Sequence, residues 1–222
     1  MLIDIHAHSY PKSEDSFMSV YELIEGSKGL GLDGVCLTDH DSFWSIAETQ
    51  ALSQRYDFLV LPGVEVNTDS GHVVVFGLDK YVFGMHKPAF LRKLVDQHGG
   101  VMIAAHPYRR RFLEEPAQDS GARQEMLDQA SADEFFDYCD AIEGINGRGS
   151  AQENRFSLDL LERLAMKPTG GSDAHRVLQL GAAATRFQKN ITGLPGLIEE
   201  IRQGRFCAVD LMNDGLSSAF DL

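Results

Sequence analysis

Short apolar runs recur along this chain and predict the strands of an α/β protein. They cover residues 2–5, 34–38, 58–66, 72–78, 101–105, 141–145 and 167–170, with further runs at 182–187 and 206–209. Many are separated by segments with helical periodicity, of which 19–30, 88–98 and 154–165 place apolar side chains on one face. Alternation of this kind predicts parallel strands with helices packed outside them.

Histidine and acidic side chains follow these runs at the points where the runs end. Residues two apart in extended backbone share a face, so His6 and His8 leave the first run side by side. The other run ends carry His40, Glu65, His106, Asp173 and His175. The carboxyl ends of the strands are where a β/α barrel builds its active site. The pattern therefore predicts a metal-binding site at one edge of a β/α barrel.

Length and composition are those of one globular domain of 222 residues. No apolar run approaches the roughly 20 residues of a spanning helix, so no membrane association is expected. The start of the chain lacks a signal-type segment, and we expect a mature N-terminus and a cytoplasmic protein. The net charge of −13 disfavours binding to duplex nucleic acid. A small anionic substrate stays open, because bound divalent cations would reverse the sign locally.

The chain offers few alternatives to metal chemistry. Cys36, Cys139 and Cys207 are isolated in the sequence, which favours packing roles over a disulfide or a nucleophile. We find no convincing Ser-His-Asp or Cys-His arrangement, no phosphate-binding P-loop and no dinucleotide-type glycine motif. His98, ahead of two glycines at a helix end, is expected to cap that helix.

Several ordered motifs together resemble one known family. They are Asp-Ile-His-Ala-His-Ser at 4–9, Leu-Thr-Asp-His-Asp at 37–41, Pro-Gly-Val-Glu at 62–65, Ala-Ala-His-Pro at 104–107, Glu-Gly-Ile-Asn-Gly-Arg at 143–148 and Gly-Ser-Asp-Ala-His at 171–175. In this order they resemble the PHP (polymerase and histidinol phosphatase) domain family of metal-dependent phosphoesterases. The resemblance implies a distorted (β/α)7 barrel, formed by a single domain over residues 1–222 with a variable, polar loop region at about 110–135.

The resemblance also implies two or three divalent ions, which could be Mn, Zn or Fe. The first ion would be held by His6, His8, Glu65 and Asp173, the second by Asp15, His40 and His175, and the third by Glu65, His72 and His106. Two of these positions have competitors, since Glu14 could replace Asp15 and His86 could replace His72. Asp4 and Asp39, each beside a ligand in sequence, are expected to orient an imidazole or a water. The absence of cysteine ligands argues against a purely structural zinc site.

These ions suit the hydrolysis of phosphate esters. A metal-activated water held by Glu65, Asp173 and His40 is the expected nucleophile. Arginines near the motifs could bind the substrate phosphate, with Arg109 favoured among the consecutive 109–111 and with Arg148 and Arg176 as further candidates.

The expected substrate is a small phosphorylated metabolite or a nucleotide. Three alternatives stay open: an exonuclease acting on the 5′ ends of short oligonucleotides, a non-catalytic metal-binding PHP module, and an amidohydrolase. The amidohydrolase would be expected to carry a metal-bridging lysine, and none follows the middle strands in that position. The sequence leaves the oligomeric state open.

Overall fold

The computed structural model describes residues 1–109 and 120–212, and within them it forms a mixed α/β fold with two sheets. The first sheet has the strand order β10 (Phe206–Asp210), β9 (Ala183–Phe187), β1 (Leu2–Asp4), β2 (Gly34–Leu37) and β3 (Leu59–Pro62). The second has the order β4 (Val64–Thr68), β5 (Gly71–Phe76), β6 (Val101–Ala104), β7 (Ala141–Asn146) and β8 (Pro168–Gly171).

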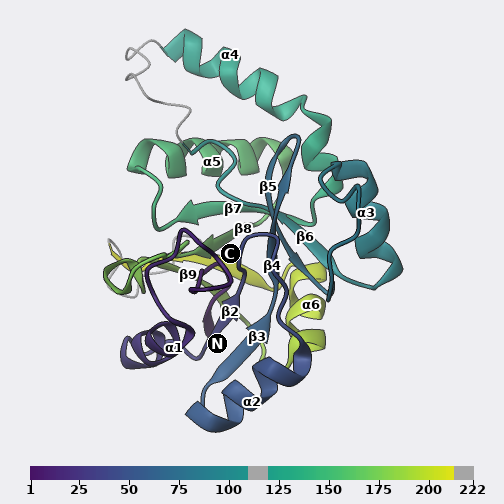
Figure 1. The fold of residues 1–222 in the computed structure, drawn as a ribbon. Coiled ribbons are helices and arrows are strands. Elements are labelled where there is room, and N and C mark those ends of the chain that lie inside the picture. The colour runs from purple at the N-terminus through teal and green to yellow at the C-terminus, as the bar shows by residue number, and fades with distance from the viewer. Residues whose placement is uncertain (110–119, 213–222) are drawn as a thin grey trace.

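Helices surround the strands (Figure 1). They are α1 (Val20–Gly29), α2 (Ile46–Tyr56), α3 (Pro88–Gln97), α4 (Ser120–Ser131), α5 (Ala151–Leu164) and α6 (Leu194–Arg202), with short 3₁₀ turns η1 (Glu134–Tyr138) and η2 (Val177–Gln179). Helices α1 and α2 contact the first sheet, while α3 and α5 contact the second. None of the helices in the described part of the chain is long and apolar enough to cross a membrane.

The predicted α/β class is confirmed, but the strand directions differ in part from the prediction. Strands β1, β2 and β3 pair in parallel, as do β6, β7 and β8. In contrast, β5 is antiparallel to both β4 and β6, and β9 is antiparallel to both β1 and β10. The strand pairing of the described residues therefore forms two sheets, where a single closed (β/α)7 barrel was expected.

The apolar run at 58–66 is split between the two sheets, whereas the sequence predicted one strand. The break falls at Gly63, where a side-chain Cβ would lie 2.7 Å from the ring of Phe76 and 2.9 Å from the methyl of Thr38. Only glycine fits this close approach without a shift of its neighbours. The chain turns at this residue, so the segment supplies β3 to one sheet and β4 to the other.

The two sheets meet at the edge where the parallel strands end. A parallel bridge joins Ala7, after β1, to Ala174, after β8. A second parallel bridge joins His40, after β2, to Glu65 in β4. Residues from both sheets that are far apart in sequence are therefore held side by side at this edge.

Serine caps start three of the helices. The side chains of Ser19, Ser45 and Ser150 each accept a hydrogen bond from the backbone N–H of a glutamate three residues later. The side chain of that glutamate accepts a hydrogen bond from the backbone N–H of the serine in return. Helix α2 has this start signal but only one buried residue, Thr49, so its apolar periodicity is too weak to predict it. Residues 120–131 form α4, although the sequence placed them in a loop region, and residues 110–119 lie outside the described part.

Two of the cysteines are expected to resist alkylation in the folded protein. Burial, with a smaller contribution from Asp4, raises the pKa of Cys36 well above its usual value. Burial, helped by Asp140, raises the pKa of Cys139 to about 12. Because the thiolate is the reactive form, iodoacetamide at pH 8 should leave both residues unmodified until denaturant is added. Peptide mass spectrometry tests this, and rapid native labelling of either residue would contradict the packing role.

Candidate metal centre

Glu65 lies at the centre of a group of histidines from both sheets. Its side chain is fully buried, in contrast to most glutamates. Its Oε2 is 3.3 Å from Nε2 of His6, 3.2 Å from Nε2 of His8 and 3.0 Å from Nδ1 of His40. The sequence placed Glu65 at the end of a strand, whereas it is the second residue of β4.

The other oxygen of Glu65 faces two further histidines. Oε1 is 2.9 Å from Nδ1 of His72 and 3.0 Å from Nε2 of His106. His72 is the second residue of β5, and because β5 is antiparallel to both β4 and β6, its start lies beside the ends of those two strands. This carboxylate therefore connects two groups of imidazoles, one on each oxygen.

Asp173 completes the buried part of the cluster. Its Oδ1 lies 3.3 Å from Nε2 of His8 and 3.8 Å from Nε2 of His6, and its Oδ2 lies 3.7 Å from Nε2 of His106. Its φ of 52° is in the left-handed region, which aspartate tolerates better than most residues. The backbone N–H of Asp173 donates to the carbonyl of His6, which ties the loop after β8 to the loop after β1.

A second group lies nearer the surface. Oδ2 of Asp15 is 3.0 Å from Nε2 of His175 and 3.5 Å from Nε2 of His40. The ring of His8 stacks on that of His40, with a centroid distance of 4.4 Å, and is tilted against that of His175, at 4.2 Å. Glu14, the competing acid, is exposed like Asp15, but no ion pair joins it to a histidine among the described residues.

The competing histidines lie elsewhere in the described part of the chain. His86 stands beside the ring of Phe83, and its carbonyl accepts from the backbone N–H of Asp69. It is in none of the ligand groups, whereas His72 is in one of them. His98 is the C-cap residue of α3, and its Nδ1 bonds to the carbonyl of Leu94, which confirms the predicted capping role.

Several ligand atoms of the cluster lack hydrogen bonds although they are buried. They are Nε2 of His6, Nε2 of His8, Nδ1 of His40, Oε2 of Glu65 and Oδ1 of Asp173. Buried polar atoms are almost always paired, and these atoms point toward one another. Four overlapping groups have ligand atoms within 4.8 Å of one another: His6, His8 and Glu65; His6, His106 and Asp173; His8, His40 and His175; His40, Glu65 and His72. Mixed imidazole and carboxylate donors in this arrangement fit divalent cations.

The electrostatics of the centre favour cation binding. Burial lowers the pKa values of His8 and His106, which keeps these rings in the neutral, metal-binding form. Burial would also lower the pKa of His6, but Glu143 and Glu65 together raise it to about 10. Burial alone would raise the pKa of Glu65, yet the surrounding imidazoles hold it well below its usual value. The site therefore carries buried negative charge that protons or metal ions neutralise.

Glu143, in β7, is a positioning residue that the sequence reasoning missed. Its Oε1 is 3.0 Å from Nδ1 of His6, which directs the other ring nitrogen of His6 toward Glu65. Its Oε2 accepts from the backbone N–H of His106 and from the side-chain amide of Asn146. A carboxylate behind a ligand histidine is a common feature of metal sites. The motif at 143–148 contained this signal, but only its arginine was assigned a role.

Replacing Glu143 with glutamine is expected to weaken metal binding by about 10-fold to 100-fold, because His6 loses its orienting carboxylate. Titration of the metal-free protein with Mn²⁺ measures the effect. Glu200→Gln is a matched control, since Glu200 is also a buried glutamate but pairs with Arg205 and is in none of the ligand groups of the described residues. Equal affinities for the wild type and Glu143→Gln would contradict the positioning role.

Backbone contacts explain how the loops hold their shape. Asp4 accepts hydrogen bonds from the backbone N–H groups of His6 and Ser172. It therefore fixes the loops after β1 and β8 through their backbones. Asp39 accepts from the backbone and hydroxyl of Ser9 and from the indole of Trp44. Both residues shape the loops that carry the candidate ligands, and their carboxylates accept hydrogen bonds from backbone N–H groups, a hydroxyl and an indole.

Ser13 supplies a side-chain contact that the sequence reasoning did not assign. Its Oγ is 3.1 Å from Nδ1 of His8 and accepts from the backbone N–H of His40 at 3.0 Å. One hydroxyl thus fixes the orientation of the His8 ring and the position of the His40 backbone.

Two of the predicted arginines reach the cluster. Arg109 forms an ion pair with Asp173. Nη1 of Arg148 lies 3.6 Å from Oδ1 of Asp173 and 2.9 Å from Nδ1 of His175. The guanidinium of Arg176 lies over the ring of Phe17. The neighbouring arginines at 110 and 111 lie outside the described residues.

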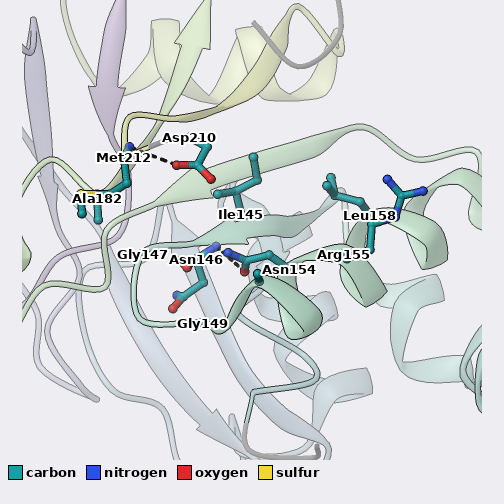
Figure 2. Close-up of a pocket in the computed structure, with 11 residues that line it drawn as sticks. Ile145, Asn146, Gly147, Gly149, Asn154, Arg155, Leu158, Ala182, Asp210 and Met212 are labelled. Atoms are coloured by element: carbon teal, nitrogen blue, oxygen red, sulfur yellow. Dashed lines mark hydrogen bonds between the residues drawn. The ribbon is translucent and has the colours of Figure 1, made fainter. Parts of the chain in front are cut away.

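Asn146 connects the centre to a cavity of about 290 Å³ (Figure 2). The side chain of Asn154 bonds to both the N–H and the carbonyl of Asn146, at 3.0 and 3.1 Å. With its backbone fixed in this way, Asn146 directs its amide toward Glu143 and Asp173, at 3.0 and 3.3 Å.

The fold and the cluster define the class of protein: a mixed α/β protein whose histidines and carboxylates gather into sites suited to divalent ions. A family model described as PHP-associated matches residues 151–206. A candidate metal-dependent phosphoesterase of Bifidobacterium adolescentis has a similar structure, with a TM-score of 0.58 and 18% identity over 95% of this chain and 97% of its own.

Two further solved structures are similar in fold. A two-domain protein of Bacteroides vulgatus, containing a predicted PHP-like metal-dependent phosphoesterase, has a TM-score of 0.62 and 16% identity over 95% of this chain and 64% of its own. An amidohydrolase of Chromobacterium violaceum has a TM-score of 0.52 and 20% identity over 78% of this chain and 87% of its own. The family-model match and the PHP-like neighbours support the PHP domain family, which confirms the resemblance predicted from the sequence.

Proposed function

We propose that this protein is a metal-dependent phosphoesterase that hydrolyses phosphate esters of small metabolites or nucleotides. The observation that carries the proposal is the set of buried, unpaired ligand atoms that converge between Glu65 and Asp173. The similarity to proteins named as metal-dependent phosphoesterases supports the same reaction class.

The proposed cofactor is two or three ions of Mn, Zn or Fe, held by His6, His8, Asp15, His40, Glu65, His72, His106, Asp173 and His175. Glu65 is suited to bridging, because each of its oxygens faces a different group of imidazoles. When bound, such ions would neutralise phosphate oxygens and lower the pKa of a water near Glu65, Asp173 and His40.

The arginines of the chain would bind and orient the phosphate. Arg109 and Arg148 both contact Asp173, so each lies at the boundary of the metal centre. Their side chains are 15% and 25% exposed, which lets a substrate reach them. A planar guanidinium matches the geometry of two phosphate oxygens. In the hydrolysis, water oxygen bonds to phosphorus, the ester P–O bond breaks, and the alcohol leaves with a proton from the water.

The alternative classes make different demands on the site. A non-catalytic module has no need for arginines beside the candidate ligands, and here Arg109 pairs with Asp173. The fold similarity to an amidohydrolase keeps that reaction as a second candidate. In this chain, however, the residue suited to bridging two ions is the carboxylate of Glu65, where an amidohydrolase would be expected to carry a lysine.

A substrate panel tests the proposal. The protein, reconstituted with Mn²⁺, is incubated with histidinol phosphate, nucleoside monophosphates, a 3′,5′-bisphosphate, a 5′-phosphorylated oligonucleotide and an N-acyl amino acid, and the products are identified. Phosphate release that a chelator abolishes is the expected result. Hydrolysis of the amide alone would favour the amidohydrolase reaction. No turnover of any compound by metal-loaded protein would favour a binding module.

A further inference from the structure

An exposed aromatic ring and a cation lie beside the second group of ligands. Phe17 is 74% exposed, and the guanidinium of Arg176 lies 4.7 Å from the centre of its ring. The two residues are far apart in sequence, yet each stands next to a ligand: Phe17 is two residues after Asp15, and Arg176 directly follows His175. No ion pair with a carboxylate is found for Arg176 among the described residues.

The backbone fixes this pair against the ligands. The N–H of Phe17 donates to the carbonyl of His175 at 2.8 Å. The buried hydroxyl of Ser16 bonds to the carbonyls of His8 and His175, at 3.0 and 3.3 Å. The segment that carries Phe17 is thus held to two ligand-bearing loops, so the ring has a defined place relative to the centre.

Burial alternates along this segment, which indicates the direction of the ring. Asp15 is exposed, Ser16 buried, Phe17 exposed and Met18 buried. The exposed side chains of Asp15 and Phe17 therefore lie at the surface on either side of the buried Ser16. Asp15 faces His40 and His175, so the ring of Phe17 lies at the surface beside these residues.

We propose that Phe17 and Arg176 form a platform for the base of a nucleoside monophosphate, an inference that rests on the proposed phosphoesterase function. Arg176 covers part of the phenyl ring and braces it through a cation–π contact. The rest of the ring stays open to solvent, and a base can stack on it, as bases do on aromatic side chains of nucleic-acid-binding proteins. The phosphate of the same molecule would then lie at the adjacent ligands, with the ribose spanning the gap.

Phe17 and Arg176 favour a substrate whose leaving alcohol carries an aromatic base over one whose leaving alcohol is a plain sugar or polyol. A phenylalanine that is 74% exposed contributes little to folding, and it offers no hydrogen bond to hydroxyl groups. A planar ring gains stacking area on it, whereas a polyol gains neither stacking nor hydrogen bonds. The platform therefore predicts discrimination between esters that carry the same phosphate and sugar and differ only in the base.

The decisive comparison is kcat/KM for adenosine 5′-monophosphate against ribose 5-phosphate. Phe17→Ala is expected to lower the ratio of the two values by about 5-fold to 150-fold, the range for the loss of one base–aromatic stack. Phe17→Trp should preserve or raise the ratio. Arg176→Gln should lower it in the same direction, and an unchanged ratio would overturn the role of Arg176. Phe83→Ala is a matched control, because Phe83 is 86% exposed but belongs to none of the ligand groups.

A binding measurement separates failure of this inference from failure of the proposed function. Calorimetry should show that wild-type protein binds adenosine 5′-monophosphate more tightly than ribose 5-phosphate, and that Phe17→Ala removes the difference. Binding of this kind without hydrolysis would support the platform and contradict the phosphoesterase proposal. Hydrolysis of both esters with a ratio that Phe17→Ala leaves unchanged would overturn the platform alone.

Discussion

Replacing Glu65 with glutamine is expected to lower kcat/KM for phosphate esters by about 1,000-fold or more. Glutamine keeps the size of the side chain but removes the charge that faces the imidazoles of both groups. Loss of a bound ion removes several kcal/mol of stabilisation from the transition state, and about 1.4 kcal/mol corresponds to tenfold in rate. Initial rates with Mn²⁺ in excess, together with the metal content of each variant, measure the effect.

His86→Ala is the matched control for this substitution. His86 lies outside the ligand groups of the described residues, so its loss should leave both the rate and the metal content unchanged. Circular dichroism should show that both variants are folded. Wild-type rates in Glu65→Gln, or a comparable loss in His86→Ala, would place the metal centre elsewhere.

Removal of metal is expected to lower the melting temperature by about 5 to 11 °C. The unpaired, buried ligand atoms of the cluster are present in the folded chain, so metal binds the folded state in preference to the unfolded one. At a free concentration 100 times Kd, such binding adds about 2.7 kcal/mol to the free energy of unfolding. In a chain of this length, each kcal/mol corresponds to about 2 to 4 °C.

Thermal unfolding with and without chelator measures the shift, and readdition of Mn²⁺ should restore it. The Glu65→Gln variant provides the internal control, because its melting temperature should depend much less on metal. A melting temperature that is independent of metal in the wild type would show that the cluster binds no ion in the folded state. Equal shifts in both proteins would indicate binding at another site.

The positions of the candidate ligand residues could be predicted because these residues recur just after the ends of predicted strands. Strand ends recur along the chain, and His6, His40, His106 and Asp173 each follow one. In each sheet the parallel strands end at the same edge, and the two sheets meet at that edge, so the prediction did not depend on a closed barrel. The structure brings these side chains together as expected, while their roles as ligands stay predictions.

The features that the sequence did not reveal depend on contacts between distant segments. Glu143 is part of a motif that the sequence shows, but its role depends on its contact with His6, which is 137 residues away in the chain. Strand direction is a property of pairing, so the antiparallel placement of β5 was not visible from its apolar run. The pair formed by Phe17 and Arg176 arises only when the loops after β1 and β8 are joined.

Phosphate ester hydrolysis by this protein is proposed to depend on metal held around Glu65. The most direct test titrates metal-free protein with Mn²⁺ and records bound metal and phosphate release in the same samples, for the wild type and for Glu65→Gln. We expect wild-type activity to rise in proportion to metal occupancy, and we expect the variant to show neither bound metal nor phosphate release. Phosphate release by metal-free wild type, or full activity in Glu65→Gln, would contradict this dependence.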